Sequence, residues 1–331
     1  NPGGVLHVYK QKIRDKERDI AEADGECKKK TPESEKKMLE KIVKNLKCSP
    51  YKNNIMRECV EVFYDKKFRE LLDQNPNLVA FQNGVYDLNA TWQTSDGQTR
   101  TGIFRTGLPE DYISKKLPIE FNENLTMESD SVQDVLRFLE QIFPDKTVRR
   151  YFLDVYCDIF YGVNTRKIVL FWTGGGDNGK SVTQGLFEKM LGDYAIKFET
   201  SLITGKKTQT GQAGPELARA GPPVRHAVLE EPEKCEQINC GILKRLSGSD
   251  SYWARDLFET GKATREIMPM FTLTFICNDL PELKNSDQAT WNRIRVIPFE
   301  STFVRPEHMD TCPVDYNEQL RQKRFPRDEN F

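Results

Sequence analysis

The chain has 331 residues, in which 49 Lys and Arg nearly balance 50 Asp and Glu. That length is enough for two domains, each able to bury a core of its own. The formal charge of −1 excludes a uniformly basic, polyanion-binding protein, so any contact with nucleic acid must come from a local group of cations.

The cysteines and the apolar segments limit the setting of the protein. None of the eight cysteines forms a C-x-x-C pair, and no histidine cluster accompanies the closest two, Cys235 and Cys240. We therefore expect reduced thiols and an intracellular location. No apolar run approaches the roughly 20 residues of a membrane span and no signal segment opens the chain, so we expect no membrane contact. The first residue, Asn1, is not Met, which indicates a fragment of a longer polypeptide.

The N-terminal part has a helical pattern followed by short β-prone runs. Residues 7–72 are rich in Lys and Glu with intermittent Leu, Ile and Val, which predicts solvated amphipathic helices, interrupted by a loop at 25–35. Asn83-Gly84 lies between runs at 78–81 and 85–88. This predicts a hairpin with a type I′ turn, because both residues tolerate positive φ. A helical and α+β domain is expected over residues 1–128.

The remainder predicts an α/β fold. Apolar residues at 132–143 and 148–160 keep helical spacing and predict two lead-in helices within 129–163. From Arg166 the chain alternates strands and helices, as a helix-covered parallel sheet requires. The expected strands lie at 168–172, 224–229 and 271–277, and a helix lies at 180–191. This second domain covers 129–303, and the Pro-rich, charged segment 304–331 is expected to be a loop-like tail that no helix closes.

A phosphate-binding motif opens the predicted helix at 180–191. Residues 174–181 read GGGDNGKS and fit G-x-x-x-x-G-K-S directly after a predicted buried strand. In such a loop, backbone N–H groups and the helix N-terminus hold phosphate oxygens, Lys180 reaches the β and γ phosphates, and Ser181 binds Mg²⁺. An ordinary glycine-rich turn is the alternative. The motif predicts ATP and Mg²⁺ as cofactors, with the binding set Gly174, Gly175, Gly176, Asp177, Asn178, Gly179, Lys180, Ser181 and Val182.

Two further strand ends carry polar side chains. Glu230 and Glu231 follow the apolar run 226–229, and we assign Glu230 to the metal and Glu231 to polarising the attacking water. Asn278 follows the run 271–277, where an amide can orient a water or sense a γ-phosphate. Solvated carboxylates capping a strand and a simple Asn-Asp turn are the alternatives. The order of these residues after the phosphate loop favours catalytic roles.

Two arginines follow in residues 291–299 (WNRIRVIPF), spaced by two on one side of an apolar run. In a ring ATPase, such an arginine crosses the subunit boundary and stabilises charge on the transferred phosphoryl group. We predict Arg293 as this arginine finger and Arg295 as a second candidate. A surface ion pair is the alternative.

Together these motifs resemble the A, B and C motifs and the arginine finger of superfamily 3 helicases. Segments that look like the helicase part of the primase-helicases of poxviruses, related large DNA viruses and some phages are 243–250 (LKRLSGSD), 254–258 (ARDLF), 271–281 and 293–299. Residues 83–88 (NGVYDL) resemble the domain that precedes that helicase. The resemblance covers about residues 76–303.

This resemblance implies an AAA+-like core and a hexameric ring that moves on single-stranded DNA during genome replication, in the host cytoplasm. It also implies a channel-facing β-hairpin between the second and third motifs, where Lys262 at the tip and Arg265 nearby would contact DNA phosphates. A solvated Lys in a turn is the alternative. The flanking Glu259 and Glu266, and Glu230 where Asp is common, depart from the pattern.

The family's primase lies in an upstream domain. No carboxylate constellation in this chain could stand for it, so we expect no primer synthesis by this chain. Two other classes of function stay open: a P-loop kinase for a small molecule, which needs neither Asn278 nor an arginine from a neighbour, and a nucleotide-dependent assembly or loading factor. Intact Lys180, Ser181 and Glu231 argue against a site that only binds nucleotide.

Overall fold

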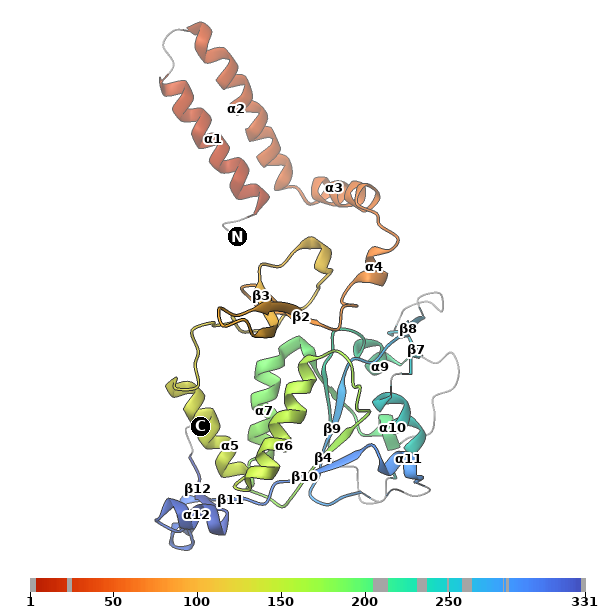
Figure 1. The fold of residues 1–331 in the computed structure, drawn as a ribbon. Coiled ribbons are helices and arrows are strands. Elements are labelled where there is room, and N and C mark those ends of the chain that lie inside the picture. The colour runs from red at the N-terminus through yellow and green to blue at the C-terminus, as the bar shows by residue number, and fades with distance from the viewer. Residues whose placement is uncertain are drawn as a thin grey trace. The chain divides into compact units, whose positions relative to one another are not determined.

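The computed structural model describes residues 4–22, 26–204, 214–230, 237–248, 250–257, 264–281, 283 and 286–328. The chain divides into two compact units, Asn1–Glu70 and Leu71–Phe331 (Figure 1). The sequence pattern instead draws the domain boundary after residue 128. Among the described residues, no helix combines the length and the apolar character needed to cross a bilayer.

The first unit consists of helices, α1 (Val5–Glu22), α2 (Glu26–Leu46) and α3 (Ser49–Val62), and the short α4 (Phe68–Leu71) follows at the boundary. The loop predicted at 25–35 is wrong, because α2 begins at Glu26 and continues through Pro32. Helices α1 and α2 pack against each other, and the Lys16–Glu35 and Lys36–Glu17 ion pairs connect them at 2.9 and 3.0 Å. Packing against α1 therefore maintains a helix that its proline disfavours.

The second unit begins with an antiparallel sheet in the order β1-β2-β3, formed by β1 (Leu78–Ala80), β2 (Val85–Gln93) and β3 (Thr99–Arg105). The predicted hairpin is confirmed, but its type I′ turn is wrong, because neither Asn83 nor Gly84 has a positive φ. The Asn83 amide exchanges hydrogen bonds of 2.8 and 2.9 Å with the Phe121 backbone, and a Cβ on Gly84 would lie 2.6 Å from the Arg105 carbonyl oxygen. Close approach of the backbone explains the glycine here.

This sheet is joined to the rest of the second unit by buried hydrogen bonds. Arg225 donates to the Leu78 carbonyl at 3.1 Å, and the Ala80 N–H donates to the Tyr194 hydroxyl at 3.2 Å. A short 3-10 turn, η1 (Pro109–Asp111), leads from β3 toward the helices that follow.

The main sheet has five parallel strands in the order β10-β4-β9-β6-β5, which confirms the predicted α/β fold with a parallel sheet. Its strands are β4 (Val169–Thr173), β5 (Ala195–Phe198), β6 (His226–Glu230), β9 (Thr272–Ile276) and β10 (Ile294–Pro298). The helical elements around it are α5 (Asp130–Ile142), α6 (Lys146–Cys157), η2 (Asp158–Phe160), α7 (Lys180–Leu191), η3 (Gly192–Tyr194), α8 (Ser201–Thr204), α9 (Pro215–Arg219), α10 (Cys240–Ser247) and α11 (Gln288–Trp291). A separate antiparallel pair, β7 (Tyr252–Ala254) and β8 (Arg265–Ile267), lies between β6 and β9 in sequence.

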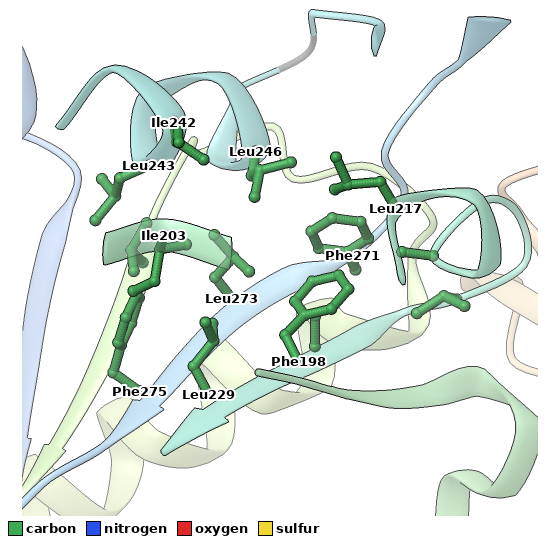
Figure 2. Packing of buried hydrophobic residues seen from close by; sticks show 14 of the residues in the cluster. Phe198, Ile203, Leu217, Leu229, Ile242, Leu243, Leu246, Phe271, Leu273 and Phe275 are labelled. Carbon is green, nitrogen blue, oxygen red and sulfur yellow. The ribbon is translucent and has the colours of Figure 1, made fainter. Parts of the chain in front are cut away.

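Both faces of the main sheet are buried, because successive strand side chains point to opposite sides. On β4, Val169 belongs to one apolar core and Leu170 to the other. Helices α5, α6 and α7 cover one face, and α9 and α10 cover the other (Figure 1). The short α8 adds Ile203 to this second core. Figure 2 shows Ile203, Leu217 and Leu243 from these last helices packed over strand residues. Each such side chain stabilises the fold by about 1.5–3 kcal/mol.

The C-terminal segment is folded, so the predicted loop-like tail without a helix is wrong. It contains β11 (Thr302–Val304), η5 (Pro306–Thr311), α12 (Tyr316–Gln322) and β12 (Arg324–Pro326). Strands β11 and β12 pair in parallel, Asp315 caps α12 through the Glu318 N–H at 3.0 Å, and Phe325 is fully buried. One buried aromatic residue and a well-capped short helix give this segment its order.

Candidate nucleotide-binding site

The predicted phosphate loop connects β4 to α7, which begins at Lys180 as expected. Gly174 and Gly179 have φ values of +137° and +84°, which residues other than glycine rarely adopt. A Cβ on Gly174 would also collide with the carbonyl oxygen of Phe299. A Cβ on Gly175 or Gly176 would meet no atom within 4 Å, so the middle of the loop borders open space. The loop therefore fits a phosphate group.

Buried polar side chains hold this loop in shape. Lys180 is only 7% exposed, and its ammonium donates to the carbonyl oxygens of Gly174 and Gly175. The Asn178 amide donates to the Phe299 carbonyl at 3.2 Å and accepts from the Lys180 N–H at 3.4 Å. A cation and the N-terminus of a 12-residue helix thus face the loop together, as anion binding requires. Ser181 and Val182 are exposed at the start of α7.

The strand order places the other predicted residues at the same end of the sheet as the phosphate loop, because the carboxyl ends of parallel strands lie side by side. Strand β9 lies directly beside β4, and the Gly174 N–H donates to the Asn278 carbonyl oxygen at 3.1 Å. Strand β6 is the next strand, so its end at Glu230 lies about 10 Å from the end of β4 at the usual strand spacing.

Glu230 is exposed and forms an ion pair with Lys197 of β5, which raises the pKa of that ammonium. The carboxylate of Glu230 and the hydroxyl of Ser181 are oxygen ligands of the kind that Mg²⁺ takes. Among the described residues, no group of three or more His, Cys, Asp or Glu forms a ready metal site. Glu231, the predicted water-polarising residue, lies outside the described residues.

Arg293 lies at the opposite end of the sheet, where the parallel strands begin. It directly precedes β10, whose residues 294–298 pair in parallel with 169–173 of β4. At about 3.3 Å per residue, Arg293 is some 17 Å along the strand from the phosphate loop of its own chain. Its guanidinium donates to the Ala289 carbonyl at 2.7 Å, and its buried Nε has no hydrogen-bond partner. Arg295 donates to the carbonyls of Asn292 and Ile294 at 2.9 and 2.8 Å.

Helix α11 positions Arg293 and is itself anchored. Asp287 caps its N-terminus by accepting from the Thr290 N–H at 2.9 Å, and Lys244 of α10 binds the same carboxylate at 2.9 Å. The Lys244 ammonium and the Thr290 hydroxyl hold the pKa of Asp287 well below its usual range.

The predicted hairpin between the second and third motifs is present as the β7–β8 pair, in which Ala254 lies opposite Arg265. Arg265 donates to the Ala218 carbonyl at 3.2 Å, and Trp253 on β7 is 66% exposed. Lys262, predicted at the hairpin tip, lies outside the described residues.

The sequence pattern missed two arginines beside the phosphate loop. Arg305 forms an ion pair with Asp177 at 3.1 Å, and Arg327 approaches the same carboxylate at 3.7 Å. Both lie in the segment predicted to be a loop-like tail, which has no periodicity to link it to the site. Pairing across 128 residues leaves no local signal.

The chain is similar to a known domain family and to several viral proteins. The D5 N terminal like family matches residues 3–144. "Putative helicase 022R" of frog virus 3 is 41% identical over 84% of this chain and 33% of its own length. "Putative helicase 121R" of invertebrate iridescent virus 3 is 44% identical over 87% of this chain and 29% of its own length. A "Putative primase" of African swine fever virus is 25% identical over 74% of this chain and 24% of its own length.

Among solved structures, the apo C-terminal region of NrS-1 is 14% identical and covers 70% of this chain and 49% of that chain, with a TM-score of 0.41. The chain spans about a third of the length of the viral relatives that it matches.

Proposed function

We propose that this chain, a member of the D5-like viral primase-helicase family, is the ATP-hydrolysing motor of a superfamily 3 DNA helicase that works as a hexameric ring. The observation that carries the proposal is the position of Arg293 at the amino ends of the parallel strands, whereas the phosphate loop lies at their carboxyl ends. Within one chain, the loop and Arg293 are separated by about the length of a strand. Arg293 could therefore reach a bound nucleotide only in a neighbouring copy of the chain.

The residues at the phosphate-loop edge would share the chemistry. Backbone N–H groups of the loop and Lys180 bind the β and γ phosphates, and Ser181 and Glu230 hold Mg²⁺, which when bound neutralises phosphate charge. Glu231 and Asn278 orient the attacking water. Arg293 of the adjacent subunit, with Arg295 as the second candidate, stabilises the charge that develops on the transferred group, an effect of about 10³–10⁵ in rate.

The surface around Arg293 supports contact with another subunit. Strand β10 is an edge strand of the main sheet. Its Val296 is 42% exposed, and Trp291 just before it is 52% exposed. Aromatic and arginine residues are enriched in subunit interfaces, which makes this edge a suitable one.

We propose single-stranded DNA as the polymer on which the ring moves, held by the β7–β8 hairpin through Lys262 and Arg265. Six copies of one or two cations are enough to hold a phosphate backbone, which reconciles DNA binding with a net charge of −1. We place the primase in an upstream domain of the full-length protein, and the site of action in viral genome replication in the host cytoplasm.

The test is ATP turnover by the purified chain, measured as phosphate release with and without single-stranded DNA, with Lys180→Ala as the inactive control. Turnover that DNA stimulates supports the motor. Turnover that requires a nucleoside and ignores DNA would support a small-molecule kinase, and stable ATP binding without hydrolysis over hours would support an assembly or loading factor.

A further inference from the structure

The β11–β12 pair presents two arginines side by side. The strands are parallel, with Val304 opposite Pro326, and Arg305 and Arg327 each follow directly after a strand end. The Arg327 N–H donates to the Val304 carbonyl at 2.9 Å, so the pairing continues to this position. Because parallel strands end at the same edge, both guanidinium groups emerge together.

Both arginines point to the phosphate loop. Arg305 donates to the two carboxylate oxygens of Asp177 at 3.2 and 3.3 Å, and Arg327 lies 3.7 Å from the same carboxylate. The Phe303 N–H donates to the Asp177 carbonyl at 2.7 Å, which ties the backbone of β11 to the loop. Asp177 has a φ of +52°, which is uncommon for a residue with a side chain, and these contacts hold it there.

Two guanidinium groups face one carboxylate at the loop, that of Asp177. A second carboxylate, Glu307, also acts on Arg305, and the Lys180 ammonium adds a positive charge within the loop itself. The side chains of Arg305 and Arg327 are 52% and 48% exposed, so an anion in the loop can approach them from solvent. Arginine binds phosphate through two parallel N–H donors, the same geometry that Arg305 now offers to Asp177.

We propose that Arg305 and Arg327 are nucleotide ligands that act in cis, exchanging part of their contact with Asp177 for the polyphosphate of a nucleoside triphosphate bound to the loop of the same chain. This inference rests on the proposed function, since its ligand is the nucleotide of that site. Arg305 and Arg327 would differ in this from Arg293, which would act on the nucleotide of a neighbouring subunit. Asp177 would hold the two arginines beside the loop when the nucleotide is absent, and its carboxylate would compete with the nucleotide for them during binding.

The experiment measures the affinity of the full chain for a fluorescent ATP analogue and for the corresponding ADP analogue. We expect Arg305→Ala to weaken binding of the triphosphate about tenfold or more, the effect of losing a charged hydrogen-bond donor, with a smaller loss for Arg327→Ala. Asp177→Asn removes the competing charge, so this variant should bind the triphosphate more tightly than the unmodified chain does. Arg321→Ala is the matched control, because Arg321 pairs with Glu318 within α12.

A purely structural ion pair would give a different pattern. Arg305→Ala and Asp177→Asn would then weaken binding alike, and that result, or normal binding by Arg305→Ala, would overturn the inference. If Arg305→Ala fails to fold, Arg305→Lys serves instead. We expect this variant to lose part of the affinity for the triphosphate, and an unchanged affinity would overturn the inference. If the unmodified chain binds nucleotide, Lys180→Ala abolishes this binding and Arg305→Ala leaves it unchanged, only the inference is rejected. If the unmodified chain binds no nucleotide, the proposed function is rejected as well.

Discussion

The backbone N–H of Gly174 donates to the carbonyl oxygen of Asn278 at 3.1 Å. One strand position earlier, the Cys277 N–H donates to the Trp172 carbonyl at 3.0 Å, so the β4–β9 pairing runs directly into the phosphate loop. The base of the loop and the position of the Asn278 side chain are therefore set by the same pair of strands. Changes to either residue test different parts of the site.

Gly174→Ala should destroy the loop. A Cβ at φ +137° would collide with the Phe299 carbonyl, so we expect a cost of about 1–3 kcal/mol in the free energy of unfolding and loss of nucleotide binding. Gly176→Ala is the control for stability, because its Cβ would meet no atom within 4 Å. Thermal unfolding and nucleotide titration measure both effects. Unchanged binding by Gly174→Ala would contradict the role given to this backbone.

Asn278→Ala should separate binding from hydrolysis. The backbone bond to Gly174 survives this change, so the loop should keep its affinity for nucleotide. Loss of the amide that orients the water should lower turnover about 100-fold. Nucleotide titration and phosphate release on the same preparation provide the comparison. Equal losses in affinity and turnover would indicate that Asn278 supports the loop and has no part in the chemistry.

Sequence patterns predicted the parts of this fold that repeat a local rule. Helix α7 begins at Lys180 as expected, because Gly179 permits a sharp turn from a buried strand into a helix. Strands β4, β6 and β9 were predicted from apolar runs, and the spacing of Arg293 and Arg295 by two indicated β10. The edge strand β5 (Ala195–Phe198) was not, because only Phe198 of its four residues is buried and the run is short.

The missed features depend on contacts between distant residues. Nothing near Pro32 announces a helix, since α2 is maintained by its packing against α1. Nothing near Arg305 announces the phosphate loop, since its partner Asp177 lies 128 positions earlier. The turn at Asn83-Gly84 was given the wrong geometry for the same reason, because Phe121 and Arg105 decide its shape.

Subunit mixing tests the placement of Arg293. Arg293→Ala should bind nucleotide normally yet lose turnover by about 10³-fold or more, because the finger serves a neighbour. Mixed in equal amounts with Lys180→Ala subunits, about a quarter of the interfaces in a random ring would pair an intact loop with an intact finger, so turnover should partly return. The same mixture with Arg295→Ala tests the second candidate. Without any rescue, the trans assignment of Arg293 fails.

The Lys197–Glu230 ion pair predicts a particular magnesium dependence. Glu230 must release Lys197 to face a metal, so Lys197→Met should lower the half-saturating Mg²⁺ concentration for turnover. The gain should not exceed about fivefold, because an exposed ion pair contributes about 0–1 kcal/mol. Glu230→Gln should shift the dependence to higher Mg²⁺. Magnesium titrations of phosphate release check both variants, and opposite shifts would remove Glu230 from the metal site.

His226 predicts how the stability of the second unit depends on pH. Burial between β6 and α6 lowers the pKa of this ring from 6.5 to about 4, so the folded chain keeps it neutral in that interval while the unfolded chain binds a proton. The free energy of unfolding should therefore fall as the pH decreases from 6.5 to about 4. The expected loss from this residue is about 2–4 kcal/mol.

His226→Gln isolates this contribution. An amide can keep the 2.9 Å hydrogen bond to the Thr274 hydroxyl without titrating, so the urea midpoint of this variant should fall less steeply across the same interval. Carboxylates that gain protons at low pH affect both proteins, and the difference between the two curves removes their effect. His308→Gln, at an exposed position, should keep the slope of the unmodified chain. Parallel curves for His226→Gln and the unmodified chain would show that His226 does not cause the loss of stability at low pH.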